Sequence, residues 1–267
     1  MKNIETVRYK ATISYDGTNF SGFQIQPHER TVQGELEKAL KTINKEKFIR
    51  IHPSGRTDSG VHARAMVFHF DFPNSIPREG LFKAINVLTP ADLSLHHLEA
   101  VANDFHARYH AKGKTYTYRV DNQKIHNPFT RNHVLHHPYS MDIKRAQLAL
   151  DVLVGTHDFT SFCSTKTDKE DKVRTIYEAR VEIDEGTREW IFTFVGDGFL
   201  YNMIRIIIGT VLAIADGRRE VSTMTEILNA KKRGAAGPTI SPKGLYLEEV
   251  HYDTEDLKNT KKIPDKR

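Results

Sequence analysis

The chain has 267 residues, enough for one large or two small domains and for a substantial buried core. Its 39 Lys and Arg residues exceed its 34 Asp and Glu residues, giving a formal charge of +5 and a pI of about 9.1. This modest basic excess is compatible with a nucleic-acid partner but does not require one. The single cysteine, Cys163, excludes an internal disulfide and favours a reducing compartment.

The N-terminal sequence and the most apolar run both indicate a cytoplasmic protein. Residues 1–5 lack the apolar segment of a secretory signal. The most apolar run, residues 203–215, is too short to span a bilayer, and Arg205 interrupts it. We therefore expect a soluble protein without a membrane segment.

Hydrophobic periodicity in the first half of the chain predicts the order β-α-β-β-α-β. Strand patterns, with apolar residues alternating or in short runs, occur at residues 7–15, 48–51, 66–72 and 93–101. Apolar residues at helical spacing occur at residues 32–43 and 77–88.

The second half repeats this plan with additions. Strand patterns occur at residues 116–120, 173–183, 190–194 and 245–252, and helical patterns at residues 143–153, 199–215 and 222–228. Asp142 and Ser222 stand where helix N-caps are expected, and Gly186 marks a hairpin turn.

Two split-βαβ patterns in tandem predict an α+β protein with two ferredoxin-like, RRM-like domains. We place the boundary near Asn103 and Asp104, giving an N-terminal domain over residues 1–103 and a C-terminal domain over residues 104–253. Residues 254–267 are charged and lack apolar periodicity, so we expect a frayed tail.

The segment Gly-Arg-Thr-Asp-Ser-Gly-Val-His-Ala, residues 55–63, is the most informative part of the chain. Two glycines bracket Asp58, and Arg56 precedes it by two positions. Glycine allows a tight bend and close approach to a ligand, so Asp58 is placed as a nucleophile or an acid/base group would be. A turn whose charge faces solvent is the alternative interpretation.

Arg205 is the second candidate, because its predicted helix is apolar on nearly every face and should be buried. A guanidinium cannot lose its charge, so a buried one needs an anion. The neighbours Tyr201, Met203 and Ile208 on the same helix are not acidic, so the partner must come from elsewhere. The alternative is a side chain that extends to the surface along its stem.

The sequence gives little support for a metal-binding or nucleotide-binding site. His106 and His110 have the i, i+4 spacing of a metal pair, but no carboxylate pattern completes a site. Residues 55–60 do not start a P-loop, because Val61 and His62 stand where Lys and Ser or Thr would be required. We therefore expect no metal.

Residues 55–63 resemble the active-site motif of the pseudouridine synthases of the tRNA pseudouridine synthase A family, in which the aspartate is the nucleophile. Ser59 is the main departure, since alanine is usual there. Further matching segments are residues 23–26, 31–34, 104–109, 155–159, 202–205 and 244–247. The resemblance therefore runs from about Tyr9 to about Tyr252.

The resemblance implies that both halves join in one continuous antiparallel sheet flanked by helices, with the active site in the central cleft. It makes Asp58 the nucleophile, Arg205 its ion-pair partner, and Tyr116 the residue that stacks on the target uracil and takes part in proton transfer. The resemblance also places Leu245 in the pocket that holds the uracil, and it implies that Arg56 helps to displace or replace the flipped base. From the residues alone, Tyr116 and Leu245 are ordinary strand residues and Arg56 is a surface arginine.

The resemblance further implies a homodimer that isomerises uridine to pseudouridine on the 3′ side of the tRNA anticodon stem-loop, without cofactor or metal. Cations suited to an RNA backbone are Arg108, Lys112, Lys114, Lys166, Lys169, Lys172 and Arg174. Two alternatives remain open: a paralogous synthase that acts on another RNA such as ribosomal RNA, and a catalytically silent RRM-like RNA-binding protein.

Overall fold

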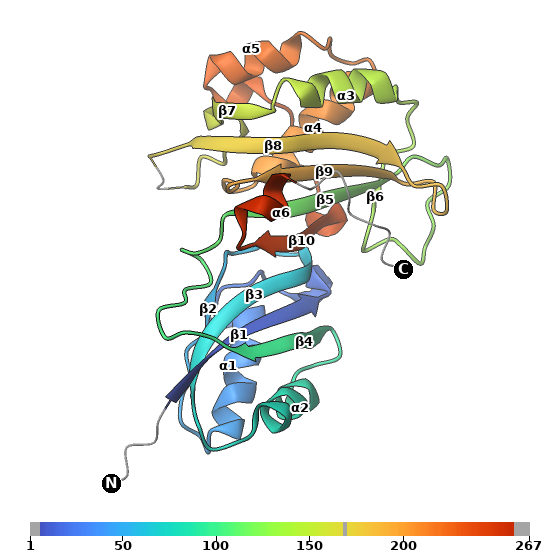
Figure 1. Ribbon diagram of the computed structural model, residues 1–267. Helices are drawn as coiled ribbons and strands as arrows, with labels where there is room; N and C mark the ends of the chain where they lie inside the picture. The colour runs from blue at the N-terminus through green and yellow to red at the C-terminus, as the bar shows by residue number, and fades with distance from the viewer. Residues whose placement is uncertain (1–5, 168–169, 259–267) are drawn as a thin grey trace. The chain divides into compact units, whose positions relative to one another are not determined.

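The computed structural model describes residues 6–167 and 170–258. Internal contacts group them into two compact units: residues 6–112 with 247–252 form unit 1, and residues 113–246 with 253–258 form unit 2. Each unit combines a mostly antiparallel sheet with helices, which confirms the predicted α+β class (Figure 1). Within the described residues, no helix is long and apolar enough to cross a membrane.

The sheet of unit 1 has the strand order β4-β1-β3-β10. Its strands are β1 (Thr6–Tyr15), β3 (His62–Pro73), β4 (Leu93–Ala100) and β10 (Leu245–His251), most of which belongs to this unit. The short β2 (His52–Pro53) pairs with β3, where His52 lies opposite His69. β1 is antiparallel to β3 and β4, and its alternate residues from Tyr9 to Tyr15 are buried, as the sequence pattern predicts.

The two helices of unit 1, α1 (Val32–Ile43) and α2 (Arg78–Leu88), pack against one another. α1 begins where the Thr31 hydroxyl accepts the Gly34 N–H at 3.2 Å. Pro77 precedes α2, whose Leu81 is fully buried. α1 buries Val32, Leu36, Ala39 and Leu40 of its predicted apolar stripe, whereas α2 buries Leu81 and Ile85 but leaves Leu88 exposed.

The sheet of unit 2 has the strand order β5-β9-β8-β7. Its strands are β5 (Gly113–Asp121), β7 (Gly155–Asp158), β8 (Val173–Ile183) and β9 (Trp190–Gly196), with the short β6 (Leu135–His136) parallel to β5. Tyr116 and Tyr118 on β5 lie opposite Phe194 and Phe192 on β9, so these four aromatic side chains share the buried face.

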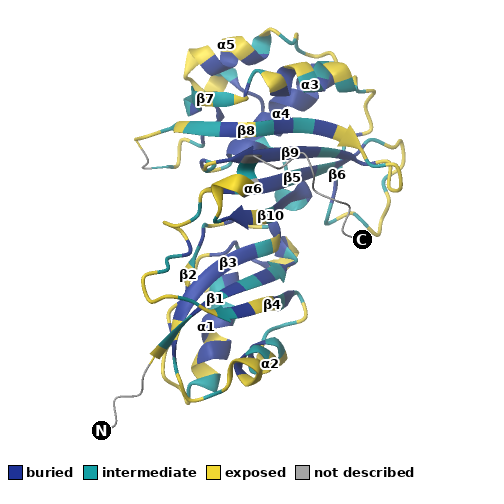
Figure 2. Cartoon of the chain, in the orientation of Figure 1, coloured by how far each residue is buried: buried dark blue, intermediate teal, exposed yellow. Residues whose placement is uncertain are grey.

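The helices of unit 2 are α3 (Ile143–Asp151), α4 (Met203–Ala215), α5 (Thr223–Ala230) and α6 (Thr254–Lys258). α3 packs against α4 and β8. Every residue of α4 except Arg205 is buried, and the helix is drawn almost entirely dark blue in Figure 2. The Asp142 carboxylate accepts the Lys144 and Arg145 N–H groups and caps α3 as predicted.

Short 3-10 turns complete the two units. They are η1 (Gly17–Asn19), η2 (Thr160–Phe162), η3 (Arg233–Ala235) and η4 (Pro242–Gly244).

Several predicted boundaries differ from the structure. The helix expected from residue 199 begins at Met203, because Asn202 has a left-handed backbone with φ of 61°. Residues 48–51 form no strand, and β2 follows them instead. Ser222 precedes α5, but its side chain makes no capping hydrogen bond. Residues 254–258 of the predicted tail form α6, and residues 259–267 lie outside the described residues.

Candidate active site

The Asp58 loop, residues 55–60, connects β2 to β3 in unit 1 and is anchored on both sides of Asp58. Before Asp58, the buried Thr57 hydroxyl lies 2.8 Å from the Tyr15 hydroxyl, and the Thr57 carbonyl accepts the Phe23 N–H at 3.2 Å. After it, the Gly60 N–H donates to the Phe20 carbonyl at 3.2 Å. These bonds fix the backbone that carries Asp58.

Gly17 and Gly22 allow the backbone of the segment 17–23 to approach the backbone of residues 57–61 closely. Gly22 has a φ of +88°, and a Cβ there would lie 2.9 Å from the Thr57 carbonyl oxygen. A Cβ on Gly17 would lie 2.1 Å from the Val61 carbonyl oxygen, closer than any real Cβ approaches. Gly55 and Gly60 are recognisable from the motif, whereas Gly17 and Gly22 were not predicted, because they belong to a segment distant in sequence.

Exposure changes sharply along the loop. Thr57 is 7% exposed, Asp58 is half-buried, and Arg56 and Ser59 are exposed. The Ser59 hydroxyl donates to the Phe20 carbonyl at 3.4 Å. The residue that departs from the family motif therefore adds a further bond to the loop's anchor.

Arg30 stabilises Phe20, the residue whose carbonyl group accepts hydrogen bonds from the loop. Its guanidinium donates two hydrogen bonds to Asp92 at 2.7 and 2.8 Å and one to Glu35 at 2.9 Å. It also lies 4.2 Å from the centre of the Phe20 ring. The hydrogen bonds to Asp92 raise the pKa of Arg30 above its usual value, so the residue remains a fixed cation. Arg30 thus holds Phe20, whose carbonyl receives Gly60 and Ser59.

Arg205 lies on α4 of unit 2, with its side chain held by two oxygens. Its Nε donates to the Ile240 carbonyl at 2.7 Å, and one Nη donates to the Asn202 Oδ1 at 2.7 Å. Asn202 precedes the helix in the left-handed conformation and makes no side-chain cap bond. Its amide therefore orients Arg205 instead of capping α4.

The segment 240–245 bonds to both Arg205 and Tyr118 of β5, and it ends at Leu245. The Tyr118 hydroxyl donates at 2.7 Å to the Ser241 carbonyl, which follows the carbonyl bound by Arg205. Burial raises the pKa of Tyr118, and the Arg205 charge opposes that rise. A Cβ on Gly244 would lie 2.6 Å from the Arg119 carbonyl oxygen and 2.8 Å from the Tyr118 ring, so this glycine lets the backbone just before Leu245 lie close to β5.

Tyr116 is 8% exposed, and its ring meets Phe199 edge to face with centroids 5.3 Å apart. Edge-to-face contact is a favoured aromatic arrangement, so the ring has a defined orientation.

The five predicted site residues are divided between the two units. Asp58 and Arg56 share one loop of unit 1, while Tyr116, Arg205 and Leu245 belong to unit 2. The pairing of Asp58 with Arg205 would link the two units, and it stays a prediction. The positioning residues that sequence reasoning missed include Asn202, Ile240, Ser241, Arg30 and Phe20; among them, only Asn202 lay in a matching segment.

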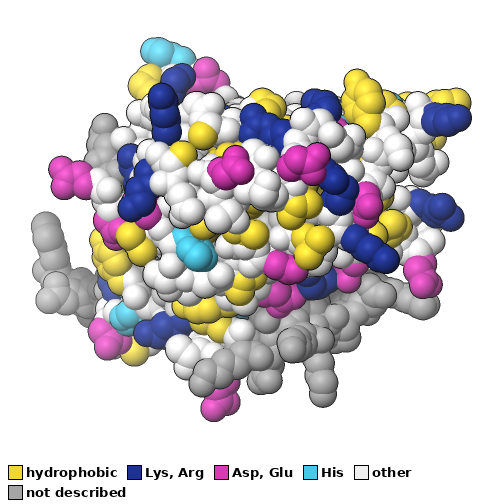
Figure 3. All heavy atoms as spheres, turned by 90° about the horizontal axis from the view of Figure 1, so that it is seen from above, with side chains coloured by type: hydrophobic (Ala, Val, Ile, Leu, Met, Phe, Trp, Pro, Cys, Tyr) yellow, Lys and Arg dark blue, Asp and Glu magenta, His cyan; other side chains and the backbone are white. Residues whose placement is uncertain are grey.

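The predicted RNA-contacting cations have different environments. Arg108, Lys112 and Lys166 are exposed, Lys114, Lys172 and Arg174 are half-buried, and Lys169 lies outside the described residues. Arg174 has Asp171 at 3.6 Å. On the face seen in Figure 3, Lys and Arg side chains are interspersed with Asp and Glu side chains.

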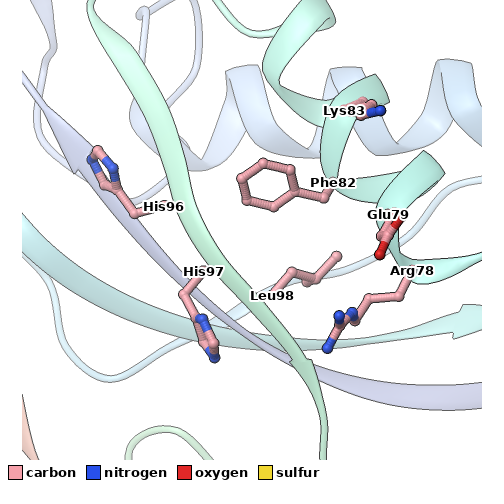
Figure 4. Close-up of a pocket in the computed structure, with 7 residues that line it drawn as sticks. All are labelled: Arg78, Glu79, Phe82, Lys83, His96, His97 and Leu98. Atoms are coloured by element: carbon pink, nitrogen blue, oxygen red, sulfur yellow. The ribbon is translucent and has the colours of Figure 1, made fainter.

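A shallow hollow of 270 Å³ in unit 1 lies between α2 and β4 (Figure 4). Its lining is Arg78, Glu79, Phe82, Lys83, His96, His97 and Leu98. It contains none of the predicted catalytic residues, so we assign it no part in the site.

Comparison with known proteins agrees with the motifs. A family model described as tRNA pseudouridine synthase matches residues 11–110 and 149–253, which include Asp58, Arg205 and Leu245 but not Tyr116. The tRNA pseudouridine synthase A of Lacticaseibacillus casei (strain BL23) is 52% identical over 91% of this chain and 99% of its own length. That of Anoxybacillus flavithermus (strain DSM 21510 / WK1) is 53% identical over 92% of this chain and 99% of its own. The chain therefore belongs to the tRNA pseudouridine synthase family.

Proposed function

We propose that this protein isomerises uridine to pseudouridine in tRNA, at uridines on the 3′ side of the anticodon stem-loop. One observation carries the proposal: Asp58 sits on a loop whose backbone is fixed by hydrogen bonds, while Asp58 itself is half-exposed. An aspartate presented in this way suits nucleophilic catalysis, because little reorganisation is needed before attack. Membership of the family supports the same reaction.

In this proposal the reaction breaks the N-glycosidic bond, turns the base within the pocket and rejoins it to the ribose through carbon. Asp58 starts the sequence, either by attack on the ribose or the base or by assisting glycal formation. The Arg205 guanidinium, oriented by Asn202 and Ile240, holds Asp58 in the ionised state that attack requires.

The remaining residues act on the base. Tyr116 stacks on the uracil and moves a proton, and Leu245 supplies the apolar wall of the pocket. Arg56, exposed on the Asp58 loop, takes the place of the flipped base. Unstacking the uridine costs a few kcal/mol, and contacts between basic side chains and the RNA backbone offset that cost. We propose that the enzyme works as a homodimer without cofactor.

The test is a tritium-release assay with purified protein and tRNA transcripts labelled at uracil C5. The proposal predicts release from a transcript with uridines on the 3′ side of the anticodon stem-loop, and loss of release when those uridines are replaced by cytidine. Release from ribosomal RNA only would favour the paralogous synthase. RNA binding without any release would favour the silent RNA-binding protein.

A further inference from the structure

Three potential metal ligands meet in unit 2, outside the candidate active site. Asp121 ends β5, His136 ends β6, and these two residues are Cα partners in the parallel pairing of the strands. His126 comes from the loop between them. Asp121, His126 and His136 each offer a ligand atom within 4.8 Å of the other two.

Asp121 is a buried carboxylate whose ion-pair partner among the described residues is His126, a side chain that is charged only when it is protonated. The residue is 4% exposed, and its Oδ1 accepts only the Gln123 N–H, at 2.9 Å, among its hydrogen bonds within the described chain. Its Oδ2 faces His126, with 3.5 Å to Nδ1. Desolvating a carboxylate is costly unless a cation compensates it.

His126 is the second unbalanced group. Both its ring nitrogens are buried, and neither has a hydrogen-bond partner within the described part of the chain. A neutral imidazole carries one N–H and one lone pair, and leaving either buried and unpaired costs free energy. A cation between His126 and Asp121 would use the lone pair and compensate the carboxylate together.

His136 is already prepared as a ligand. Its Nε2 lies 2.8 Å from the Gln123 carbonyl oxygen and therefore carries the proton, which leaves the Nδ1 lone pair available. A ring N–H donated to a backbone carbonyl is the usual support of a metal-bound histidine. The ring centres of His126 and His136 are 4.7 Å apart.

We propose that Asp121, His126 and His136 bind a zinc ion, with water as the fourth ligand. Zinc bonds of about 2.0–2.2 Å in a tetrahedron place neighbouring ligand atoms about 3.3–3.5 Å apart. The Oδ2 to Nδ1 distance of 3.5 Å already has this value, and the third ligand must move inward by at most about 1.5 Å from its 4.8 Å limit. Two imidazoles and a carboxylate suit zinc and disfavour magnesium.

A bound zinc ion would link the loop of residues 122–134 to β5 and β6, the strands on either side of it. That loop carries Ile125 and Phe129, which are 86% and 89% exposed. The site lies within residues 111–148, which the family model leaves unmatched, so family membership does not imply it. No metal was expected from the sequence, because only His106 and His110 were weighed as a metal pair and the family resemblance implies no metal.

A second histidine cluster, in unit 1, provides a matched control. His52, His69 and His106 also bring ligand atoms within 4.8 Å. However, Nδ1 of His69 accepts the Ala107 N–H at 3.1 Å, and Nδ1 of His106 accepts the Arg108 N–H at 3.1 Å. Their Nε2 atoms must then carry the protons, so these two rings have no lone pair left for a metal.

The experiment is titration of the chelator-treated full-length protein with Zn²⁺, in competition with a chromophoric chelator. We expect one equivalent to bind. His126→Gln and Asp121→Asn should each weaken binding at least about 100-fold, since even a supporting residue costs 10- to 100-fold. His106→Gln should bind like the unmodified protein, and Mg²⁺ should not compete. Circular dichroism verifies that each variant is folded.

A second readout is hydrogen exchange, in which Zn²⁺ should slow exchange of residues 122–134 in the unmodified protein but not in His126→Gln. Absence of stoichiometric binding would overturn the proposal. So would binding that survives both His126→Gln and Asp121→Asn, or binding that His106→Gln abolishes. The outcome is independent of the proposed synthase activity, because no catalytic residue is changed.

Discussion

We propose Asp58 as the nucleophile, and hydrogen bonds of the neighbouring residues fix the loop that carries it. Asp58→Asn should abolish isomerisation and leave RNA binding intact, because the amide keeps the shape but loses the charge and the nucleophile. Single-turnover tritium release measures the first effect and filter binding the second. Asp151→Asn, at the exposed end of α3, is the control and should remain active. Activity of Asp58→Asn within tenfold of the unmodified enzyme would remove Asp58 from its role.

Tyr116→Phe separates stacking from proton transfer. The phenyl ring keeps its face, so RNA affinity should hardly change, whereas turnover should fall roughly 10²–10⁴-fold if the hydroxyl moves a proton. Tyr116→Ala should also lose the stacking, worth about 1–3 kcal/mol per base. Comparison of kcat with Kd for RNA gives the separation.

The control for Tyr116→Phe should be a tyrosine whose hydroxyl makes no hydrogen bond that supports the site. Tyr118 is unsuitable, because its hydroxyl donates to Ser241 beside the carbonyl that holds Arg205. Tyr177→Phe on β8, where the side chain is 43% exposed, should be silent. A normal Tyr116→Phe together with an inactive Tyr177→Phe would mean that the site has been placed on the wrong strand.

Arg205→Leu should reduce activity strongly. It should also lower the free energy of unfolding by about 1–3 kcal/mol, because the Ile240 carbonyl and the Asn202 amide lose their donor. Urea denaturation and tritium release measure the two effects. Arg78→Leu, at the exposed start of α2, should change neither greatly. A fully active Arg205→Leu would contradict the assignment of Arg205 to the site.

At the level of elements, the Asp58 loop depends on how closely the segment 17–23 can approach it. Gly22→Ala should lower activity and stability, because the new Cβ would meet the Thr57 carbonyl at 2.9 Å. Gly217→Ala is a matched control: its φ is +80°, close to the +88° of Gly22, but nothing lies within 4 Å. Both variants bear the backbone strain of about 1 kcal/mol. Equal losses in the two would show that crowding of the loop has no effect.

His69 should make the stability of unit 1 depend on pH. Burial lowers its pKa from 6.5 to about 4, with contributions from His106, His52 and Arg8, while Asp71 acts in the opposite direction. As the pH falls, the unfolded chain therefore binds a proton at His69 before the folded chain does. The contribution of His69 to the free energy of unfolding should be fully present above pH 6.5 and should be lost as the pH falls toward 4. His69→Gln should flatten this decline in urea denaturation at pH 7, 6, 5 and 4. An unchanged slope would mean that His69 is not its source.

Periodicity predicted most elements of the fold because their apolar stripes are long. β6, with two residues, and β7, with four, are too short to establish a pattern, and they were missed. The start of α4 was misplaced because Asn202 adopts a left-handed conformation that composition does not reveal.

The candidate site was predictable where a motif is contiguous, as it is around Asp58. Its supports were not predictable, because they join residues far apart in sequence. Gly22 lies against Thr57, and Arg205 bonds to Ile240. Such pairs leave no local signal, so only the folded chain reveals them.

At the scale of the whole molecule, we propose that Asp58 makes this chain a synthase for uridines in the tRNA anticodon stem-loop. Units 1 and 2 each contribute part of the predicted catalytic set, so activity should require both. The most direct test maps pseudouridine in total RNA from a strain that lacks the protein and carries either the unmodified gene or the Asp58→Asn variant. We expect pseudouridine to be lost from the 3′ side of the anticodon stem-loop when the protein is absent and to return only with the unmodified gene. Pseudouridine that persists at those positions without the protein, or returns with Asp58→Asn, would contradict it.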